Sequence, residues 1–422
     1  MMESDVIIIG SGVAGLISAL EIDQSREIVL ITKKSLEDSN SYLAQGGISA
    51  LLDETDRERY IEDTLRAGHY KNTKPAVDTL VDESRAAIAT LEKYGVPFSR
   101  DTQGNLLLTR EGAHSVNRIR YCEDQTGKYI MDALIAEAKI RPNIKILENT
   151  KCDDLLIRDG KIYGVSASNR TNFNIYADFT ILACGGLGGL FENTTNFRHI
   201  CGDGIELALE HNIDLKDISY IQIHPTALYE DNTERRFLIS ESVRGEGAVL
   251  LNHKKERFTD ELKPRDVVSK AILEEMKREK VKYEFIDFST IKLDIDERFP
   301  NITKHLRELG YDLRRDLVPI VPAYHYTMGG IRVDLDARTN IENLYAVGEV
   351  ACTGVHGQNR LASNSLLESV VFGKRCANDI NNSEKDFYNI KKLAYSSIDF
   401  SKAKEKIEER IREDEKSKTS QV

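Results

Sequence analysis

One segment of the 422-residue chain, HGQNRLASNSLLES at residues 356–369, gathers side chains that can bind a polar ligand. It contains one Arg, two Asn, three Ser and one His, and then becomes apolar in a pattern typical of a helix. Buried donors without acceptors are costly, so this density of polar groups requires partners. Arg360 can grip a carboxylate through two parallel hydrogen bonds, and Ser363 and Ser365 add single donors. We therefore expect this segment to line a site for an acidic ligand, together with elements elsewhere in the chain.

The first such element lies at the N-terminus. DVIIIGSGVAGLISALEI predicts a buried strand over 6–9, a glycine turn and a helix from about Val13. Gly10 permits the tight turn, Gly12 lets backbone approach a pyrophosphate, and Gly15 lets the helix press on the strand. The helix N-terminus supplies free N–H groups to the phosphates. A turn without a ligand is the alternative, but the position directly after an apolar strand favours dinucleotide binding. The expected contacts are Gly10, Ser11, Gly12, Val13, Ala14 and Gly15.

Later strands point to the same nucleotide. The second strand, REIVLI, ends at TKK and lacks the acidic residue that usually holds an adenosine ribose, so Lys33, Thr32 or backbone must do so. This tells against a plain NAD-dependent dehydrogenase. ADFTILACGGLGGLF and NLYAVGEVACTG predict buried strands that return to the cofactor, and Glu349 after the second can hold ribitol or ribose hydroxyls. In SYLAQGGISALL, Gly46 and Gly47 let backbone lie against a flat ring, with a simple turn as the alternative.

The remaining pattern divides the chain into segments. Residues 54–94 show helical spacing of apolar residues, and residues 143–168 predict short strands with a turn at Asp159-Gly160. Between Ile218 and Tyr326 the charge density rises and the glycine-ended strands stop. We predict an α/β fold: a Rossmann-like dinucleotide-binding domain, an inserted α+β capping domain and a short C-terminal helical tail. The predicted bounds are 1–217 and 327–380 for the first domain, 218–326 for the cap and 381–422 for the tail.

Composition argues against several classes of protein. The net charge of −11 argues against a nucleic-acid or anionic-membrane partner. No apolar run approaches the roughly 18 residues that a membrane span requires. Six scattered cysteines without a C-x-x-C pair fit reduced thiols in a cytoplasm better than a disulfide or zinc framework. MMESD shows neither the cationic region nor the cleavage site of a secretory signal. We expect a cytoplasmic protein without a metal site.

Several motifs together resemble the L-aspartate oxidase family, within the wider succinate dehydrogenase and fumarate reductase flavoprotein superfamily. They run in the family's order across residues 5–375: GSGVAGL, SYLAQGGISA, LLTREGAHSVNRI, CGDGIELA, QIHPTAL, SESVRGEGAVL, LKPRDVVSKAI, PAYHYTMGGI and VGEVACTGVHGQNRLASNSLLES. The resemblance implies an FAD enzyme that oxidises L-aspartate to iminoaspartate, the first step of bacterial-type NAD biosynthesis. O2 or fumarate would be the electron acceptor. Because iminoaspartate hydrolyses readily, a quinolinate synthase is a candidate partner. The FAD contacts implied beyond the glycine turn are Lys33, Asn40, Ser41, Ala44, Gln45, Gly46, Gly47, Asp203, Glu349, Ser365 and Leu366.

The matched positions also imply a substrate site. Two carboxylates and one ammonium must be held beside the flavin, and a planar guanidinium matches a carboxylate with two hydrogen bonds. A single His is more often a satisfied structural residue, but donors inside matched motifs favour a site. The residues implied are His224, Ser240, Arg265, His325, Arg360 and Ser363, with Arg265, His224 and Glu111 as the catalytic set.

Glu111 separates the relatives from one another. Succinate and fumarate have no ammonium group, so a carboxylate in their site would repel them, whereas it offsets the charge of the aspartate amine. The alternative is a surface carboxylate in a loop. Arg265 matches the superfamily's proton-transferring arginine, but Arg stays protonated and is a poor general base. We expect Arg265 to act mainly as a clamp while hydride passes from Cα to flavin N5, and we leave proton transfer open.

Two departures from the superfamily bear on function. Relatives that tether the flavin covalently use a His ahead of the A-Q-G-G motif, where this chain has Asn40, so the flavin should be non-covalent. The family usually ends in a longer helical bundle than this tail, so either the bundle is trimmed here or a neighbouring chain replaces it. One alternative function is a soluble fumarate reductase or succinate-oxidising flavoprotein, which Glu111 argues against. A non-catalytic nucleotide-binding protein or a methyltransferase would not need the paired His and Arg residues.

Overall fold

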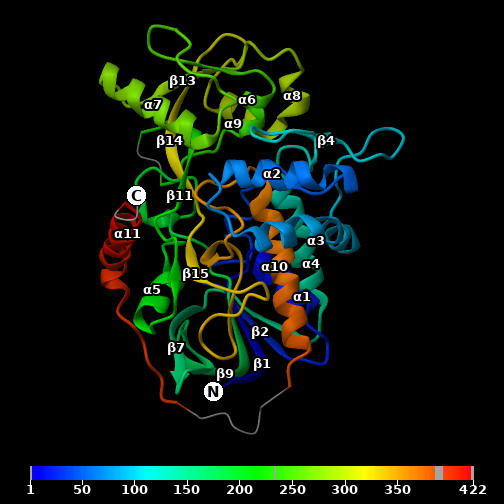
Figure 1. The fold of residues 1–422 in the computed structure, drawn as a ribbon, viewed down its shortest axis with the longest axis vertical. Coiled ribbons are helices and arrows are strands. Elements are labelled where there is room, and N and C mark those ends of the chain that lie inside the picture. Colours follow the sequence, from blue (N-terminus) through cyan, green and yellow to red (C-terminus); the bar gives the residue numbers. More distant parts are fainter. Residues whose placement is uncertain (1, 232–233, 385–392, 420–422) are drawn as a thin grey trace.

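The computed structural model describes residues 2–231, 234–384 and 393–419. At its centre lies a mixed sheet in the order β6-β2-β1-β9-β8-β7, with β16 also paired to β9 (Figure 1). Strands β1, β2, β6, β9 and β16 are parallel to their neighbours in this group, and β7 and β8 add an antiparallel hairpin. The strands are β1 (Met2–Ile9), β2 (Ile28–Ile31), β6 (Ile144–Leu147), β7 (Lys151–Arg158), β8 (Lys161–Ser168), β9 (Asn172–Leu182) and β16 (Leu344–Ala346).

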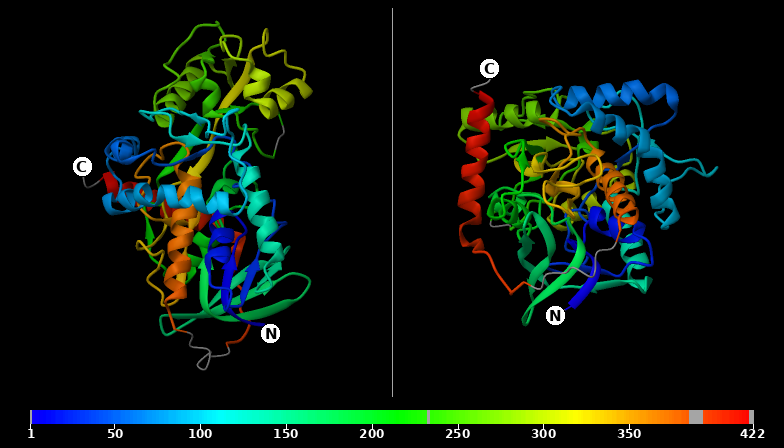
Figure 2. Two further views of the ribbon diagram at one scale, coloured as in Figure 1. Left: turned by 90° about the vertical axis from the view of Figure 1, so that its right-hand side faces the viewer. Right: turned by 60° about the horizontal axis from the view of Figure 1, so that its bottom comes forward.

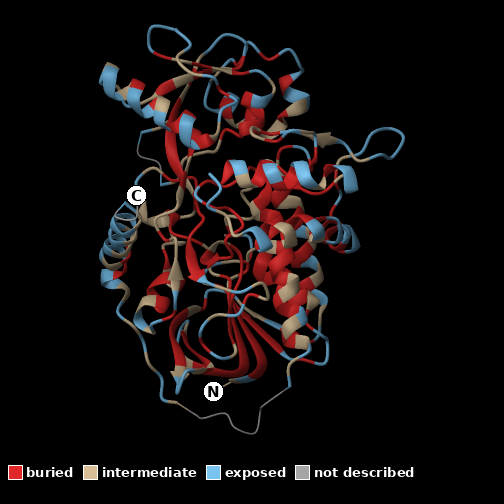
Figure 3. Cartoon of the chain, in the orientation of Figure 1, coloured by how far each residue is buried: buried red, intermediate tan, exposed pale blue. Residues whose placement is uncertain are grey.

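The apolar run of β1 is buried on both faces of the sheet. Val6 and Ile8 belong to one hydrophobic core, and Ile7 and Ile9 belong to a second core on the opposite face. Alternate side chains of a strand point to opposite faces, so a continuous apolar run marks a strand that is covered on both sides. Figure 3 shows these strands as a buried block in the lower half of the molecule. The strands predicted in VIII, REIVLI, ADFTIL and NLYAV are therefore confirmed as β1, β2, β9 and β16 of one sheet.

Helices cover the first face, beside the glycine turn. They are α1 (Val13–Glu21), α2 (Arg57–Ala67), α3 (Lys74–Lys93), α4 (Thr126–Ile140) and α10 (Asn364–Asn381), and all contribute to the first core. Helix α10 packs along α1, which brings the polar segment 356–369 next to the glycine turn (Figures 1 and 2). The helix predicted from the apolar part of that segment is confirmed.

The helical stretch predicted over 54–94 is interrupted. A short 3-10 turn, η1 (Glu54–Asp56), leads into α2, and α3 starts only at Lys74. Between them Gly68 ends α2, and His69 and Tyr70 adopt left-handed φ values of 55° and 54°. Pro75 then occupies the first turn of α3, a position at which Pro favours a helix start. The hairpin turn predicted at Asp159-Gly160 is confirmed, with φ values of 54° and 77°.

A second group of elements extends from the middle of the molecule to one end (top of Figure 1). Its antiparallel sheet has the order β11-β14-β13-β12, and its helices pack around a third hydrophobic core built from residues between Leu228 and Ile320. The elements are β11 (Ile221–Leu228), α6 (Glu241–Gly245), β12 (Val249–Leu251), α7 (Arg265–Glu279), β13 (Glu284–Asp287), α8 (Ile295–Arg298), α9 (Pro300–Glu308) and β14 (Val318–Thr327). The domain boundaries at 217 and 326 stay a prediction.

The remaining elements are short, apart from the last helix. They are β3 (Ile48–Ser49), β4 (Leu108–Thr109), β5 (Ile119–Arg120), η2 (Gly188–Leu190), α5 (Asp203–Glu210), β10 (Leu215–Lys216), β15 (Gly330–Arg332), η3 (Gly348–Val350), β17 (Ala351–Cys352), η5 (Phe400–Lys402) and α11 (Ala403–Thr419). Helix α11 runs along the outside next to α5 (Figure 2), where Ile407 is buried and Lys406 pairs with Glu206 at 2.7 Å.

The tail predicted over 381–422 is only partly helical. Residues 393–399 form no helix, α11 covers 403–419, and residues 385–392 and 420–422 lie outside the described part of the chain. No helix among the described residues is both long and apolar enough to span a bilayer.

Candidate active site

A cavity of about 410 Å³ is lined by the glycine turn after β1, the loop 38–47, the segment ahead of α10, and residues of β11, α6, α7 and β14. The residues predicted for cofactor or substrate contact all line it except Gly15. A Cβ at Gly15 would lie 2.1 Å from the carbonyl oxygen of Gly10, so Gly15 serves the packing of helix on strand instead. The predicted residues are thus gathered around one space, while their roles toward a ligand stay a prediction.

Backbone defines one end of the cavity. Gly10 has a φ of 114°, and a Cβ there would lie 2.2 Å from the carbonyl oxygen of Ala183 at the end of β9. Helix α1 begins after Gly12 with no carboxylate in its first turn, and the Val13 N–H donates to Ser41 Oγ at 3.2 Å. The turn therefore combines a close strand-to-strand approach with a helix N-terminus that carries partial positive charge.

Lys33, predicted to contact the adenosine ribose, is paired within the protein. Its Nζ lies 2.6 Å from Oδ2 of Asp203, the first residue of α5, and both side chains line the cavity. Burial disfavours the charged form, but Asp203 outweighs this and raises the pKa of the Lys33 ammonium. An acidic side chain from α5 thus stands beside the end of REIVLI, paired with Lys33.

Unpaired polar atoms line the middle of the cavity, which tests whether a large polar cofactor fits. Asn40 Nδ2, Gln45 Oε1 and Asn196 Nδ2 are buried and have no hydrogen-bond partner within the described residues. Such atoms are costly unless a ligand or water satisfies them. Glu349 also lines this region, where it accepts from the Thr327 N–H at 3.0 Å, and burial raises its pKa to about 7. These donors and acceptors fit the ring edges and hydroxyls of FAD.

Gly46 and Gly47 are needed for protein contacts as well. A Cβ at Gly46 would lie 2.6 Å from Glu111 Oε1, and one at Gly47 would lie 2.4 Å from the carbonyl oxygen of Arg120. At Gly47 the neighbouring atom is backbone, so only glycine fits there, whereas at Gly46 an added atom would displace the Glu111 carboxyl group. Their predicted approach to a flat ring stays a prediction.

Two arginines converge at the other end of the cavity. Arg265, the first residue of α7, donates from Nε to Glu241 Oε2 at 2.5 Å and from Nη1 to Gln222 Oε1 at 2.9 Å. Arg360 Nε donates to the same Gln222 oxygen at 3.3 Å. The Arg360 guanidinium lies 4.7 Å from the centre of the Tyr326 ring, and burial lowers its pKa to about 10. One amide oxygen thus holds two cationic side chains from distant parts of the chain.

His224 and His325 face each other across neighbouring strands. Their ring centres lie 5.1 Å apart at an angle of 61°. Burial and the nearby positive charge of Arg265 lower the pKa of both imidazoles well below the ordinary value, so both are neutral. His224 Nδ1 accepts from the Thr226 N–H at 3.2 Å, which leaves its Nε2–H as a donor.

Glu111 is buried inside this cationic region rather than exposed in a loop. It accepts from Ser363 Oγ at 2.6 Å and from Ser242 Oγ at 3.1 Å. Burial and the negative charge of Glu241 raise the pKa of the Glu111 carboxyl, while Arg265 acts in the opposite direction. Ser240 joins the same group through Ser242, with the two hydroxyl oxygens 3.3 Å apart. The surface-carboxylate alternative is therefore wrong.

Sequence reasoning missed several residues of this region. Gln222 and Glu241 stand inside the motifs QIHPTAL and SESVRGEGAVL, and buried Arg244 lies 3.8 Å from Glu241. The i,i+3 spacing of Glu241 and Arg244 predicts that the two side chains are neighbours on a helix, but no pattern indicated their burial or the role of Gln222. Arg235 also lines the cavity, with its guanidinium 5.5 Å from the centre of the Phe197 ring, and no pattern marked it. Across the described residues, no group of three or more His, Cys, Asp or Glu side chains could hold a metal ion.

Comparison with known proteins defines the class first. A family model described as "FAD binding domain" matches residues 5–366, so the fold and the cavity are those of an FAD-binding flavoprotein. The chain is 51% identical to the L-aspartate oxidase of Clostridium acetobutylicum over 385 residues, covering 90% of this chain and 89% of that protein. It is 41% identical to the L-aspartate oxidase of Bacillus subtilis, covering 92% and 74%. The chain therefore belongs to the L-aspartate oxidase family.

Solved structures agree with the fold. A chain of E. coli quinol fumarate reductase is 29% identical, with a TM-score of 0.84, and the match covers 97% of this chain and 74% of that chain. A flavocytochrome c3 fumarate reductase is 25% identical with a TM-score of 0.71 and covers 90% of this chain and 78% of that chain. The predicted fold class, a Rossmann-like FAD-binding domain with an inserted α+β cap and a C-terminal helix, is confirmed.

Proposed function

We propose that the protein oxidises L-aspartate to iminoaspartate with FAD and passes the electrons to O2 or fumarate. The observation that carries this proposal is the buried Glu111 carboxylate, which shares one cavity with Arg265 and Arg360. The arginines suit the two carboxylates of a dicarboxylate. Glu111 would repel such a ligand unless the ligand also bears a cation, as the ammonium of aspartate does. Names of relatives that are 51% and 41% identical support the same activity.

FAD would be held non-covalently between the glycine turn and the loop 38–47. The unpaired atoms of Asn40, Gln45 and Asn196 and the carboxylate of Glu349 are the groups that suit its polar edges and hydroxyls. Asn40 cannot form the covalent tether that a His forms in other flavoproteins. When bound, FAD supplies the acceptor for a hydride and thus for both electrons of the amine oxidation.

The side chains around the substrate then have distinct tasks. Arg265 and Arg360 hold the carboxylates and fix Cα, while the neutral His224 and His325 donate single hydrogen bonds and add no further charge. As the Cα–H bond breaks, hydride leaves Cα, the C–N bond gains double-bond character, and the amine loses one proton. Glu111, whose carboxyl pKa is raised by burial, would accept that proton. Arg265 would stabilise the developing charge, held in place by its contact with Glu241.

Two further parts of the proposal concern organisation. The division into 1–217 with 327–380, 218–326 and 381–422 is supported by the separate core between Leu228 and Ile320. Because iminoaspartate hydrolyses readily, an enzyme that consumes it, such as a quinolinate synthase, is the expected partner in NAD biosynthesis.

Anaerobic bleaching of the flavin tests the proposal. The purified protein should be yellow, lose its absorbance near the flavin band on addition of L-aspartate, and release its flavin on acid precipitation. In the Glu111→Gln variant the preference for L-aspartate over succinate, measured as the ratio of the two kcat/KM values, should fall by about tenfold or more, which corresponds to the loss of one charge-assisted contact. Wild-type protein that bleaches with succinate but not with aspartate would make it a fumarate reductase, the alternative supported by the 29% identical E. coli chain.

A further inference from the structure

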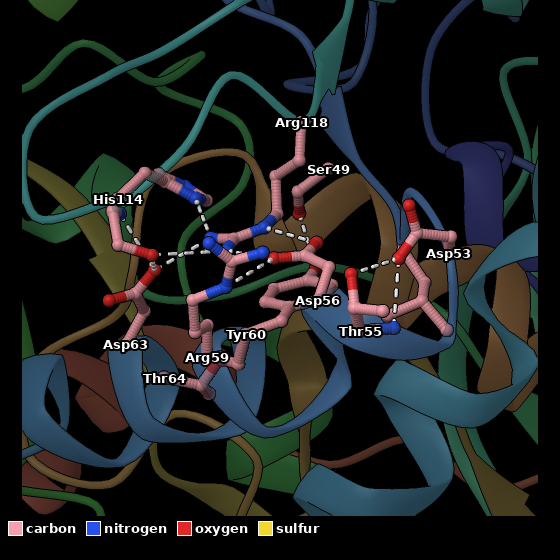
Figure 4. A network of polar contacts seen from close by, with 12 residues as sticks. Ser49, Asp53, Thr55, Asp56, Arg59, Tyr60, Asp63, Thr64, His114 and Arg118 are labelled. Atoms are coloured by element: carbon pink, nitrogen blue, oxygen red, sulfur yellow. Dashed lines mark hydrogen bonds and ion pairs between the residues drawn. The ribbon is translucent and has the colours of Figure 1, made fainter.

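A buried polar cluster around Arg118, drawn in Figure 4, lies outside the cavity. At its centre is Arg118, whose side chain is 0% exposed. Arg118 forms two hydrogen bonds to Asp56, at 3.1 and 2.8 Å, and a third to Asp63 Oδ2 at 2.7 Å. Its guanidinium also lies 4.6 Å from the centre of the Tyr60 ring. Burying a cation with two carboxylates costs desolvation energy that can exceed the gain from their attraction, so such a cluster is weak evidence for a purely stabilising role.

His114 connects this cluster to the active-site turn. Its Nδ1 lies 2.9 Å from Arg118 Nη1, and its Nε2 lies 2.9 Å from the carbonyl oxygen of Ala362. Arg118 can only donate and the carbonyl can only accept, so the imidazole must accept at Nδ1 and donate at Nε2. Burial, followed by the charge of Arg118, lowers the pKa of His114 to about 4, in keeping with this neutral tautomer.

The two partners of His114 make it a link between two functional segments. Glu111 and His114 belong to one loop, in which the His114 N–H donates to the Glu111 carbonyl at 3.3 Å. Ala362 and Ser363 belong to the turn ahead of α10, where Ser363 has a left-handed φ of 62°. Loop and turn are therefore joined twice, by Ser363 Oγ to the Glu111 carboxylate and by His114 Nε2 to the Ala362 carbonyl.

The far side of the same turn is also held. The Ser363 carbonyl accepts from the N–H and the hydroxyl of Ser49, each at 3.1 Å. The Tyr60 hydroxyl donates to Ser49 Oγ at 2.6 Å and lies 2.9 Å from Asn364 Oδ1. Because a left-handed φ is unfavourable for Ser, these contacts are what keep Ser363 in position to hold Glu111.

We propose that His114 is a positioning residue for the ammonium subsite, oriented by the Asp56–Asp63–Arg118 cluster and acting through the Ala362 carbonyl. This inference rests on the proposed role of Glu111 in recognising an amine. It assigns part of the discrimination between an amino dicarboxylate and a plain dicarboxylate to a residue that does not line the cavity. A 1 Å displacement of Glu111 would weaken its contact with the ammonium, while Arg265, carried by α7 and held by Glu241, would keep its position.

Two substitutions of His114 separate its two hydrogen bonds. In His114→Asn the side-chain oxygen can replace Nδ1 toward Arg118, but nothing reaches Ala362. In His114→Gln the side-chain amide can replace Nε2 toward Ala362, but the contact to Arg118 is lost. We expect His114→Asn to lower the kcat/KM ratio of L-aspartate to succinate by about three- to tenfold, the range for one lost hydrogen bond. His114→Gln should keep this ratio within about twofold of wild type, although its Tm should fall by about as much as that of His114→Asn.

The readouts distinguish this role from a merely structural one. General loosening would lower turnover of both substrates alike and reduce the FAD content per protein, so an unchanged ratio in His114→Asn would overturn the inference. A ratio lowered equally by both variants would also overturn it.

Tyr60→Phe is a second test that does not depend on the folding of the His114 variants. It removes one hydroxyl from the other side of the turn and should shift the ratio in the same direction by a smaller factor. An unshifted ratio in that variant would contradict the inference. If wild type itself does not oxidise L-aspartate, the proposed function fails before any variant is compared.

Discussion

The two ends of the cavity are built in different ways. At the end that suits the cofactor, the chain approaches closely through glycine between residues 10 and 13, and a helix N-terminus joins a few polar side chains such as Asn40 and Gln45. At the end that suits the substrate, the groups are side chains carried by β11, α6, α7, β14 and the turn ahead of α10. Those side chains are held by one another, as in the shared contact of Arg265 and Arg360 with Gln222.

This difference predicts different kinds of failure. A close backbone contact tolerates no added atom where the neighbouring atoms are themselves backbone, as at Gly10. A side-chain site loses function by steps, since each group contributes a hydrogen bond or a charge whose removal leaves the fold in place. Substitutions at the two ends should therefore differ in what is lost, with cofactor and fold at one end and rate and preference at the other.

The largest effect is expected for Gly10→Ala. Its Cβ would lie 2.2 Å from the Ala183 carbonyl oxygen at a φ of 114°, so the contact between β1 and β9 would have to open. We expect a protein that retains no FAD and has a strongly reduced Tm, measured by flavin absorbance per protein and circular dichroism. Gly104→Ala is the matched control, because Gly104 has a φ of 86° with nothing within 4 Å of the added Cβ. It should cost only about 1–2 kcal/mol of backbone strain and keep its FAD. Equal behaviour of the two variants would contradict the steric argument.

Arg265→Lys should spare the fold and reduce the rate. A Lys ammonium can still pair with Glu241, but it cannot also reach Gln222 and a substrate carboxylate in a planar arrangement. We expect kcat/KM for L-aspartate to fall by about 100-fold, or roughly 2.7 kcal/mol, with unchanged FAD content. Arg278→Lys on the same helix, with a side chain that is 61% exposed, should have no effect on the rate. Loss of FAD in Arg265→Lys would show that the two ends are not independent.

The same contrast explains how much could be predicted from sequence. Gly10, Gly12 and the apolar strand before them follow one another, so a local pattern was enough to predict the nucleotide end and its sheet. The substrate residues are far apart in the chain, and only the resemblance to a family brought His224, Arg265 and Arg360 together. Partners that depend on three-dimensional proximity could not be predicted in this way, such as Gln222 for both arginines, Asp203 for Lys33 and His114 for the Ala362 carbonyl.

Glu349 is a side chain at the cofactor end, and we expect its substitution to have a smaller effect, on the pH dependence of Tm. Its pKa is raised from 4.5 to about 7 by burial. A carboxyl with a raised pKa in the folded state gives stability that is fully present below its unfolded pKa and is lost as the pH rises through about 7. In FAD-free protein, Glu349→Gln should therefore reduce the fall in Tm between pH 5 and pH 8 by several degrees. Glu58→Gln, at a side chain that is 81% exposed, should leave that fall unchanged. Parallel Tm profiles for wild type and Glu349→Gln would contradict the assignment.

The smallest effect is expected at Arg235, which tests whether the substrate end also attracts its ligand by long-range electrostatics. Arg235 is half-buried, lines the cavity, and has no carboxylate partner among the described residues, and burial lowers its pKa. In a chain with a net charge of −11, an unpaired cation at this cavity would raise the local concentration of a dicarboxylate. Arg235→Gln should lower kcat/KM for L-aspartate by about threefold at low ionic strength and leave kcat unchanged. The difference from wild type should vanish near 0.5 M salt, where the screening length is about 4 Å.

Arg170→Gln removes the same charge from an exposed residue outside the cavity and should leave both constants unaltered. A fall in kcat that persists at high salt would mean that Arg235 contacts the bound ligand, and the substrate end would then extend further toward Phe197 than the two arginine clamps define.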